Sequence, residues 1–246
     1  MSGGYFWNLY EKNLEASRRR ALDMIPKMKN QQLLVDAGCG NGKMSYRVMS
    51  AAGLQEVVGL ELASESAREA KSQQLKVIRA DLNFCIPLAD ASADIVFAHH
   101  VFAHLTDHDT FVSEISRVLR PNGCCIVSTE NLSAWHNILS LIAGFQDFSH
   151  NMSSVWYIGN PLSPHYGERT PAGFSPHFKI FTARSLREIF EVHGLHVERW
   201  IGTGCYPFPR TIARFIERVD PWHGQFLTVK ARKRPYQEPI NKIGRK

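Results

Sequence analysis

The sequence predicts an α/β fold with a doubly wound, mostly parallel seven-stranded sheet, and three observations support this prediction. Short apolar runs alternate with segments of helical periodicity, as they do where helices cross over between parallel strands. A glycine-rich turn, residues 38–42, joins the first apolar run to the first such helix. The length of 246 residues suits one α/β domain and is short for two. We therefore expect a single domain over residues 1–246.

The apolar runs give the expected elements in order. A helix over residues 5–28 precedes the first strand, because apolar positions recur there at helical spacing. The strands expected next are residues 33–35, 57–60, 76–80, 94–98 and 124–128. The helices between them begin near Lys43, at Ser64 and at Asp109, with the last two residues as N-caps. The sequence Arg120-Pro-Asn-Gly123 is expected to stop the third of these helices before the fifth strand.

The alternation breaks after the fifth strand and then resumes. Residues 131–178 begin with a short amphipathic helix that ends at Gly144, followed by a stretch rich in Pro, Gly, Ser, His and aromatic residues. A long segment of this composition is typically functional, and its aromatic content argues against disorder. We interpret it as an insert that covers the substrate. After the insert we expect a helix capped by Thr182 or by Ser185, and Ser185 would form a capping box with Glu188. The last expected elements are a strand over 195–201, a helix from Pro209 and a strand over 226–231.

Composition narrows the functional class. Hydrophobic residues make up 44% of the chain and charged residues 21%, with no apolar run of membrane-spanning length. The first residues lack the pattern of a secretory signal, so we expect a cytoplasmic protein. The five cysteines show neither a disulfide framework nor zinc spacing, so we expect buried thiols and no metal site.

The net charge is +6, and a basic tail over residues 232–246 contributes part of it. A basic segment can bind nucleic acid or a membrane surface, but a solvated tail is the interpretation we favour. Nucleic acid is therefore not the expected partner.

The glycine turn is the strongest functional signal. Glycines permit positive φ and let the backbone approach a ligand closely, at the edge of the sheet where open α/β folds bind ligands. Glu61 ends the second strand about 20 residues later, the spacing at which an acid reaches a ribose. Asp36 precedes the glycines and suits a ligand with a cationic group. Lys43 stands where a dinucleotide site needs a third small residue, which disfavours an NAD dehydrogenase.

The stretch Val35-Asp-Ala-Gly-Cys-Gly-Asn-Gly42 resembles the nucleotide-binding motif of the class I S-adenosylmethionine-dependent methyltransferases. Leu119-Arg-Pro-Asn-Gly123 before an apolar strand is also typical of that family. The resemblance rests on specific motifs over residues 33–128. Over residues 182–231 it rests only on the order of the expected helices and strands. It implies a Rossmann-like methyltransferase fold with a reversed final strand. It also implies S-adenosylmethionine as cofactor and S-adenosylhomocysteine as product.

The resemblance also assigns cofactor-binding roles to residues at matching positions. The implied contacts with the methionine end are made by Asp36, Gly38, Gly40, Gly42 and the backbone of His99. The implied contacts with the ribose and the adenine are made by Glu61, Leu62, Asp81 and Leu82. A turn-capping aspartate remains the alternative for Asp81.

Methyl transfer to a hydroxyl needs a positioned base, and histidine is the natural choice. His177, where the insert rejoins the fold, is our first candidate, and His100, after the fourth strand, is the second. The residues proposed to contact substrate are His104, Trp156, Tyr157, His165 and Tyr166. A structural or surface histidine is the alternative at each histidine position.

The acceptor is expected to be a small molecule, most often methylated on oxygen. The Asn-Pro-Pro-Tyr or Asp-Pro-Pro-Tyr signature of many nucleic-acid and protein amide methyltransferases of the family is absent, and residues 99–102 read His-His-Val-Phe instead. Two alternatives stay open: an RNA or protein methyltransferase that uses the basic tail, and a non-catalytic S-adenosylmethionine-binding protein. The expected state is a monomer or a homodimer.

Overall fold

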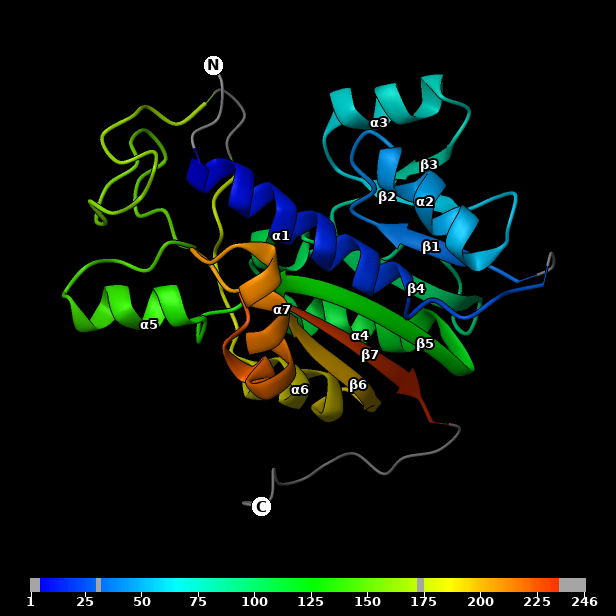
Figure 1. The fold of residues 1–246 in the computed structure, drawn as a ribbon. Coiled ribbons are helices and arrows are strands. Elements are labelled where there is room, and N and C mark those ends of the chain that lie inside the picture. The colour runs from blue at the N-terminus through cyan, green and yellow to red at the C-terminus, as the bar shows by residue number, and fades with distance from the viewer. Residues whose placement is uncertain (1–4, 30–31, 172–174, 235–246) are drawn as a thin grey trace.

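The computed structural model describes residues 5–29, 32–171 and 175–234, and its centre is one seven-stranded sheet (Figure 1). The strands lie in the order β3-β2-β1-β4-β5-β7-β6, and β7 runs antiparallel to both of its neighbours. The strand bounds are β1 Leu34–Ala37, β2 Val58–Glu61, β3 Lys76–Arg79, β4 Ala93–His99, β5 Leu119–Glu130, β6 Leu195–Thr203 and β7 Phe226–Lys233. The doubly wound, mostly parallel sheet with a reversed last strand is confirmed.

Helices cover both faces of this sheet. Their bounds are α1 Tyr5–Leu22, α2 Lys43–Ala52, α3 Ser64–Ser72, α4 His108–Val118, α5 Trp135–Ile142, α6 Ala183–Val192 and α7 Arg210–Val219. Two short 3-10 helices, η1 Phe102–His104 and η2 Pro221–His223, complete the set among the described residues. Val48 of α2 and Ala70 of α3 belong to a buried cluster on one face, and Phe111 of α4 and Phe190 of α6 belong to the cluster on the other. No helix of the described residues has the length and apolar character required to cross a membrane.

Two helix ends differ from the sequence prediction. Helix α1 ends at Leu22 rather than near residue 28, because Pro26 has no backbone N–H and disfavours helical geometry in the residue before it. The N-cap of α4 is Asp107 rather than Asp109, and its side chain accepts a hydrogen bond from the Thr110 N–H at 2.9 Å. Asp109 lies in the first turn and pairs with His193.

The N-cap of α3 and the capping box of α6 also differ from the sequence prediction. Ala63 precedes α3 without a side-chain cap, where Ser64 was expected, and its N–H donates to Glu61 Oε1 at 2.8 Å. For α6 the two candidates act together, because Thr182 is the N-cap and Ser185 completes the capping box in place of Glu188.

Strand β5 is longer than predicted at both ends. Residues Arg120–Gly123, expected to stop the preceding helix before this strand, belong to the strand itself, because Leu119 pairs with Ala93 and a register shift follows in β4. At the other end Thr129 and Glu130 pair with Leu227 and Phe226 of β7. This extension carries Glu130 to the edge where the other parallel strands end.

The basic tail begins inside the fold. Arg232 and Lys233 belong to β7, where Arg232 pairs with Glu198 and Lys233 donates to the Leu119 carbonyl at 2.9 Å. Arg234 follows β7, and residues 235–246 of the predicted tail lie outside the described residues. Four of the five cysteines are buried thiols, as expected, and Cys85 is exposed.

Candidate active site

The glycine turn opens onto the carboxyl ends of β1 and β4. The N–H groups of Gly38 and Cys39 both donate to the Leu60 carbonyl, at 2.9 and 3.0 Å, which ties the turn to β2. At Gly38, φ is +78° and a Cβ would lie 2.6 Å from Val101 Cγ2, so only glycine fits. At Gly40 the space that a Cβ would occupy has no atom within 4 Å. The backbone at Gly40 is therefore accessible to a ligand.

Two carboxylates flank this turn. Glu61 Oε2 accepts the Gly40 N–H at 2.8 Å, which holds the end of β2 against the turn. Asp36 is 2% exposed and accepts a hydrogen bond from the Ser45 hydroxyl at 2.5 Å. Burial raises the pKa of Asp36 to about 6, the Ser45 hydrogen bond opposes this rise, and the Glu61 charge adds to it. A cationic ligand group beside Asp36 would offset the free-energy cost of burying its ionised carboxylate.

The ends of β2 and β3 carry the other predicted cofactor residues. Asp81 Oδ1 accepts from the backbone N–H and the side-chain amide of Asn83, at 3.0 and 2.9 Å. These are the contacts of a turn-capping aspartate, so both interpretations of Asp81 remain. Leu82 is buried and packs in the core, whereas Leu62 is half-exposed.

A cavity of about 290 Å³, here the crevice cavity, lies over the carboxyl ends of β1, β4 and β5 and under α1; Glu61, Leu62, Asp81 and Leu82 are not among its described lining residues. Its lining includes the predicted residues Asp36, Gly38 and His99. The other lining residues are Tyr10, Leu14, Arg18, Met44, His100, His104, Glu130 and His177. Buried atoms of His99 (Nε2), His100 (Nε2) and Glu130 (Oε2) have no hydrogen-bond partner among the described residues. Unpaired buried polar atoms are costly, so the crevice cavity fits a polar ligand.

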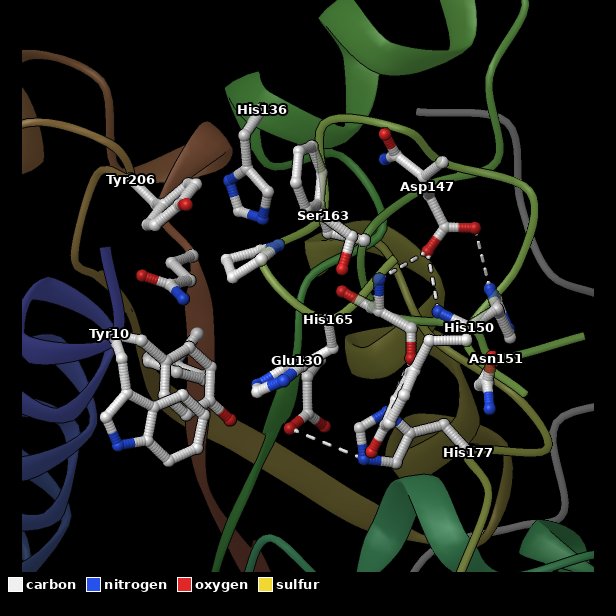
Figure 2. A pocket seen from close by; sticks show the side chains of 18 of the residues that line it. Tyr10, Glu130, His136, Asp147, His150, Asn151, Ser163, His165, His177 and Tyr206 are labelled. Atoms are coloured by element: carbon white, nitrogen blue, oxygen red, sulfur yellow. Dashed lines mark hydrogen bonds and ion pairs between the residues drawn. The ribbon is translucent and has the colours of Figure 1, made fainter. Parts of the chain in front are cut away.

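Glu130 lies between two histidines at the end of β5. His100 Nδ1 is 3.0 Å from Glu130 Oε1. His177 Nε2 is 3.7 Å from the same atom, and Figure 2 shows this second contact. Burial alone would raise the pKa of Glu130. The charges of His100 and His177, together with the His100 hydrogen bond, outweigh burial and hold the pKa below its ordinary value. Glu130 is therefore an ionised carboxylate inside the protein.

The orientation of His177 is fixed by the insert. Its Nδ1 is 2.7 Å from the Ser149 carbonyl oxygen, and because a carbonyl only accepts, Nδ1 carries the hydrogen. In the neutral ring Nε2 then holds a lone pair on the side of Glu130. His104 lies beside this ring, with centroids 4.6 Å apart, and burial together with the His177 charge lowers the pKa of His104.

A second cavity of about 240 Å³, here the insert cavity, lies between α1, β7 and the insert (Figure 2). Its aromatic walls are Trp7, Tyr10, Phe148, Tyr157, Tyr206 and Phe226. Tyr10, Glu130 and His177 line both cavities. Burial and the Glu130 charge raise the pKa of the Tyr10 phenol, which therefore remains protonated. The described lining residues of the insert cavity include no lysine or arginine.

The predicted substrate residues are divided by the structure. Tyr157 and His165 line the insert cavity, with ring centroids 5.3 Å apart. His104 lines the crevice cavity instead. Trp156 and Tyr166 are exposed and are not among the described lining residues of either cavity, and the Arg169 guanidinium lies over the Trp156 ring.

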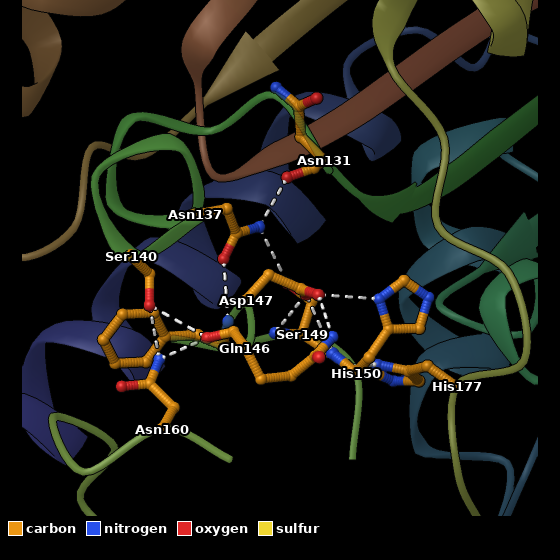
Figure 3. A network of polar contacts seen from close by, with 10 residues as sticks. Asn131, Asn137, Ser140, Gln146, Asp147, Ser149, His150, Asn160 and His177 are labelled. Carbon is orange, nitrogen blue, oxygen red and sulfur yellow. Dashed lines mark hydrogen bonds and ion pairs between the residues drawn. The ribbon is translucent and has the colours of Figure 1, made fainter. Parts of the chain in front are cut away.

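A buried polar network organises the insert around Asp147 (Figure 3). Asp147 accepts from the backbone N–H groups of Ser149 and His150, at 2.9 and 3.0 Å, and its other oxygen is 2.9 Å from His150 Nδ1. Burial opposes the ionised form, but the hydrogen bond and charge of His150 outweigh it and lower the pKa of Asp147. Because Ser149 in turn binds His177, this network holds the histidine in place.

Sequence reasoning missed Glu130, Arg18 and Asp147. Glu130 is the last residue of β5, beyond the end that the apolar run predicted for this strand. Arg18 lies on α1 among other arginines, with nothing in the sequence to single it out. Among the described residues, no group of three or more His, Cys, Asp or Glu is placed to hold a metal ion.

Comparisons with known proteins agree with this geometry. A family model described as a methyltransferase domain matches residues 35–127. The chain is 31% identical over 221 residues to trans-aconitate 2-methyltransferase of Azoarcus sp., an alignment that covers 83% of this chain and 81% of that protein. It is 28% identical to malonyl-[acyl-carrier protein] O-methyltransferase of Yersinia pestis, covering 77% and 72% of the two chains. With other curated relatives the alignment spans 35% to 48% of their length.

The fold has solved counterparts. The crystal structure of an S-adenosylmethionine-dependent methyltransferase from Mesorhizobium loti superposes with a TM-score of 0.59 at 19% identity, covering 89% of this chain and 100% of that one. That similarity shows the fold alone. The membership of the family is shown by the sequence identity with the Azoarcus enzyme. The chain belongs to the class I S-adenosylmethionine-dependent methyltransferases, and S-adenosylmethionine is its cofactor.

Proposed function

We propose that this methyltransferase acts on an oxygen atom of a small molecule held in the insert cavity. The observation that carries the proposal is the junction of the two cavities at Tyr10, Glu130 and His177. An electrophile in the crevice cavity and an acceptor in the insert cavity would meet at these three side chains. Of the two cavities, only the crevice cavity adjoins the glycine turn.

The crevice cavity fits the cofactor. We infer that Asp36 and the turn at Gly38, Gly40 and Gly42 hold its methionine end, together with the backbone of His99. Arg18 supplies a guanidinium to the same cavity and suits the methionine carboxylate. Glu61 and Leu62 are the proposed ribose contacts, and Asp81 and Leu82 the proposed adenine contacts. The unpartnered Nε2 of His99 and the open space at Gly40 support this placement.

Removal of the acceptor's proton falls to His177 in this proposal. When bound, S-adenosylmethionine supplies an electrophilic methyl group. The lone pair on His177 Nε2 accepts the hydroxyl proton of the acceptor, while its Nδ1–H stays bonded to the Ser149 carbonyl. The ionised Glu130, 3.7 Å away, stabilises the imidazolium that forms. A base in this position contributes about 10²–10⁴-fold to the rate. His100 donates to Glu130 from the other side and helps to keep that carboxylate ionised.

The walls of the insert cavity favour a small, largely apolar acceptor. Six aromatic side chains enclose it, and its charged lining residues are the carboxylates Glu130 and Asp147 rather than cations. A polyanion such as RNA would gain nothing from such walls. The Yersinia pestis relative, named an O-methyltransferase, supports oxygen as the acceptor atom.

Methyl-labelled S-adenosylmethionine tests the proposal. The purified chain is incubated with the cofactor and, in separate reactions, with extracted small metabolites, with RNA and with protein. We expect label to appear in the small-molecule fraction, on an oxygen atom identified by mass spectrometry and NMR. Transfer into RNA or protein, or to nitrogen or carbon of a metabolite, would contradict it.

Glu61→Gln is expected to weaken cofactor binding. A hydrogen bond to a charged group contributes about 1.5–3 kcal/mol, which corresponds to roughly a 10- to 150-fold larger Kd by calorimetry. The two Glu61 oxygens accept from different backbone N–H groups, those of Gly40 and Ala63, and glutamine keeps an oxygen for one of them. The matched control is Glu56→Gln on the loop before β2, where the side chain is exposed and pairs with Lys76. Equal Kd values for the two variants would remove Glu61 from the site.

A further inference from the structure

Helix α5 has its polar side chains inside and its apolar side chains outside. His136, Asn137 and Ser140 are buried, whereas Leu139 is 60% and Ile142 is 78% exposed. A helix on the surface of a globular protein normally shows the reverse arrangement. The helix is held this way because Asn137 donates to the Asn131 carbonyl at 2.9 Å and Ser140 donates to the Gln146 carbonyl at 2.9 Å (Figure 3).

Helix α7 continues the exposed apolar surface. Ile212, Phe215 and Val219 recur at helical spacing and are 47%, 66% and 66% exposed. The two helices meet where Trp135 Nε1 of α5 donates to Asp220 Oδ2, just after α7, at 2.8 Å. We call the combined surface the α5–α7 face; it consists of Trp135, Leu139, Ile142, Ile212, Phe215 and Val219.

The charge beside this face is positive. Arg214 and Arg218 are exposed on α7, next to the apolar stripe. Glu217, the one carboxylate within the described residues of the two helices, is buried and held by Arg20 and Arg210. Asp220, at the seam, is engaged by Trp135 and His223. Helices α5 and α7 themselves therefore present apolar groups and cations without an exposed carboxylate, while Glu11 and Glu15 of α1 line a cavity that Arg214 also lines.

We propose that the α5–α7 face docks on the surface of a lipid bilayer that contains anionic lipids. Exposed apolar patches of this kind mark interaction sites. Helix α7 presents an apolar stripe beside arginines, and Trp135 of α5 lies at its end, a combination that has the chemistry of the membrane interface. The arginines complement anionic headgroups. His136 on the opposite side of α5 lines the insert cavity, so docking would bring that cavity close to the membrane surface.

Co-sedimentation of the full chain with vesicles tests this proposal. We expect binding to vesicles of phosphatidylcholine mixed with phosphatidylglycerol, and weaker binding to phosphatidylcholine alone. Leu139→Glu together with Ile142→Glu is expected to lower the partition coefficient at least about tenfold for each side chain withdrawn from the bilayer. Arg214→Gln and Arg218→Gln are each expected to lower it about fivefold on the anionic vesicles only.

Controls separate docking from damage to the fold. Ile78→Glu replaces an exposed apolar side chain on β3, at the opposite edge of the sheet, and should leave vesicle binding unchanged. The Leu139 and Ile142 variant should keep the wild-type circular dichroism spectrum and Kd for S-adenosylmethionine, because both side chains are exposed. Absence of wild-type binding to either vesicle, or equal binding by the variant, would overturn the proposal. So would a homodimer of the wild type in ultracentrifugation that the same variant abolishes, because the face would then bind a second copy.

Discussion

Replacing His177 by alanine is expected to lower kcat about 10²- to 10⁴-fold, the contribution of a positioned general base. The Kd for S-adenosylmethionine should change far less. His177 lines both cavities, and its Nε2 is 3.7 Å from Glu130 while its Nδ1 is fixed by the Ser149 carbonyl. Removing the ring takes away the proton acceptor and leaves the glycine turn and Glu61 intact. Single-turnover kinetics with the identified acceptor measure the loss, and calorimetry measures the cofactor affinity.

The matched control for this variant is His165→Ala. His165 also lines the insert cavity, but its Nδ1 is 2.9 Å from Glu168 and it has no described contact with Glu130. We expect this change to act mainly on KM. Added imidazole should partly restore turnover of the His177 variant and should not affect the His165 variant. A His177 variant with normal kcat, or a His177 variant whose lost turnover imidazole does not restore, would contradict the assignment of proton removal to His177.

The cofactor end of the site was predictable because its signals are local. A turn that needs positive φ at Gly38 and close packing against Val101 must be glycine, so the sequence records it directly. Glu61 follows from the position at which an apolar run ends, and parallel pairing of β1 with β2 brings it to the turn. The reversed β7 followed only from the family resemblance, since no local feature distinguishes its direction.

The acceptor end was not predictable from local signals. Glu130 was missed because β5 was expected to end at Ser128, and the two further pairs with Leu227 and Phe226 depend on a strand almost 100 residues later. Helix α5 was expected, yet periodicity reports only that one face is apolar and not which face is buried. The buried face is the polar one, because Asn137 and Ser140 find partners in the insert. Such partners are fixed by tertiary structure.

Asp36→Asn is expected to stabilise the cofactor-free protein at neutral pH while it weakens cofactor binding. Burial raises the pKa of Asp36 from 3.8 to about 6. The folded state therefore binds a proton more tightly than the unfolded state, so stability falls as the pH rises from about 4 to about 6 and stays low above that range. The shift corresponds to about 3 kcal/mol at pH 7. Asparagine is neutral and can still accept the Ser45 hydrogen bond, so the variant should lack this fall.

Urea unfolding at pH 7 and at pH 4 measures the stability, and calorimetry measures the affinity. At pH 7 the variant should be more stable than the wild type by up to about 3 kcal/mol, and at pH 4 the difference should nearly vanish. The Kd for S-adenosylmethionine should rise at least about tenfold, because a buried carboxylate facing a cationic ligand contributes more than 1.4 kcal/mol. Asp90→Asn, at an exposed carboxylate paired with Arg117, is the control and should show neither effect. A variant that lost stability at pH 7 would show that the Asp36 charge serves the fold, and a variant that bound the cofactor normally would show that this charge does not serve the ligand. A variant that is more stable at pH 7 and binds the cofactor more weakly would mean that the protein retains a destabilising charge at Asp36 because the bound cofactor compensates it.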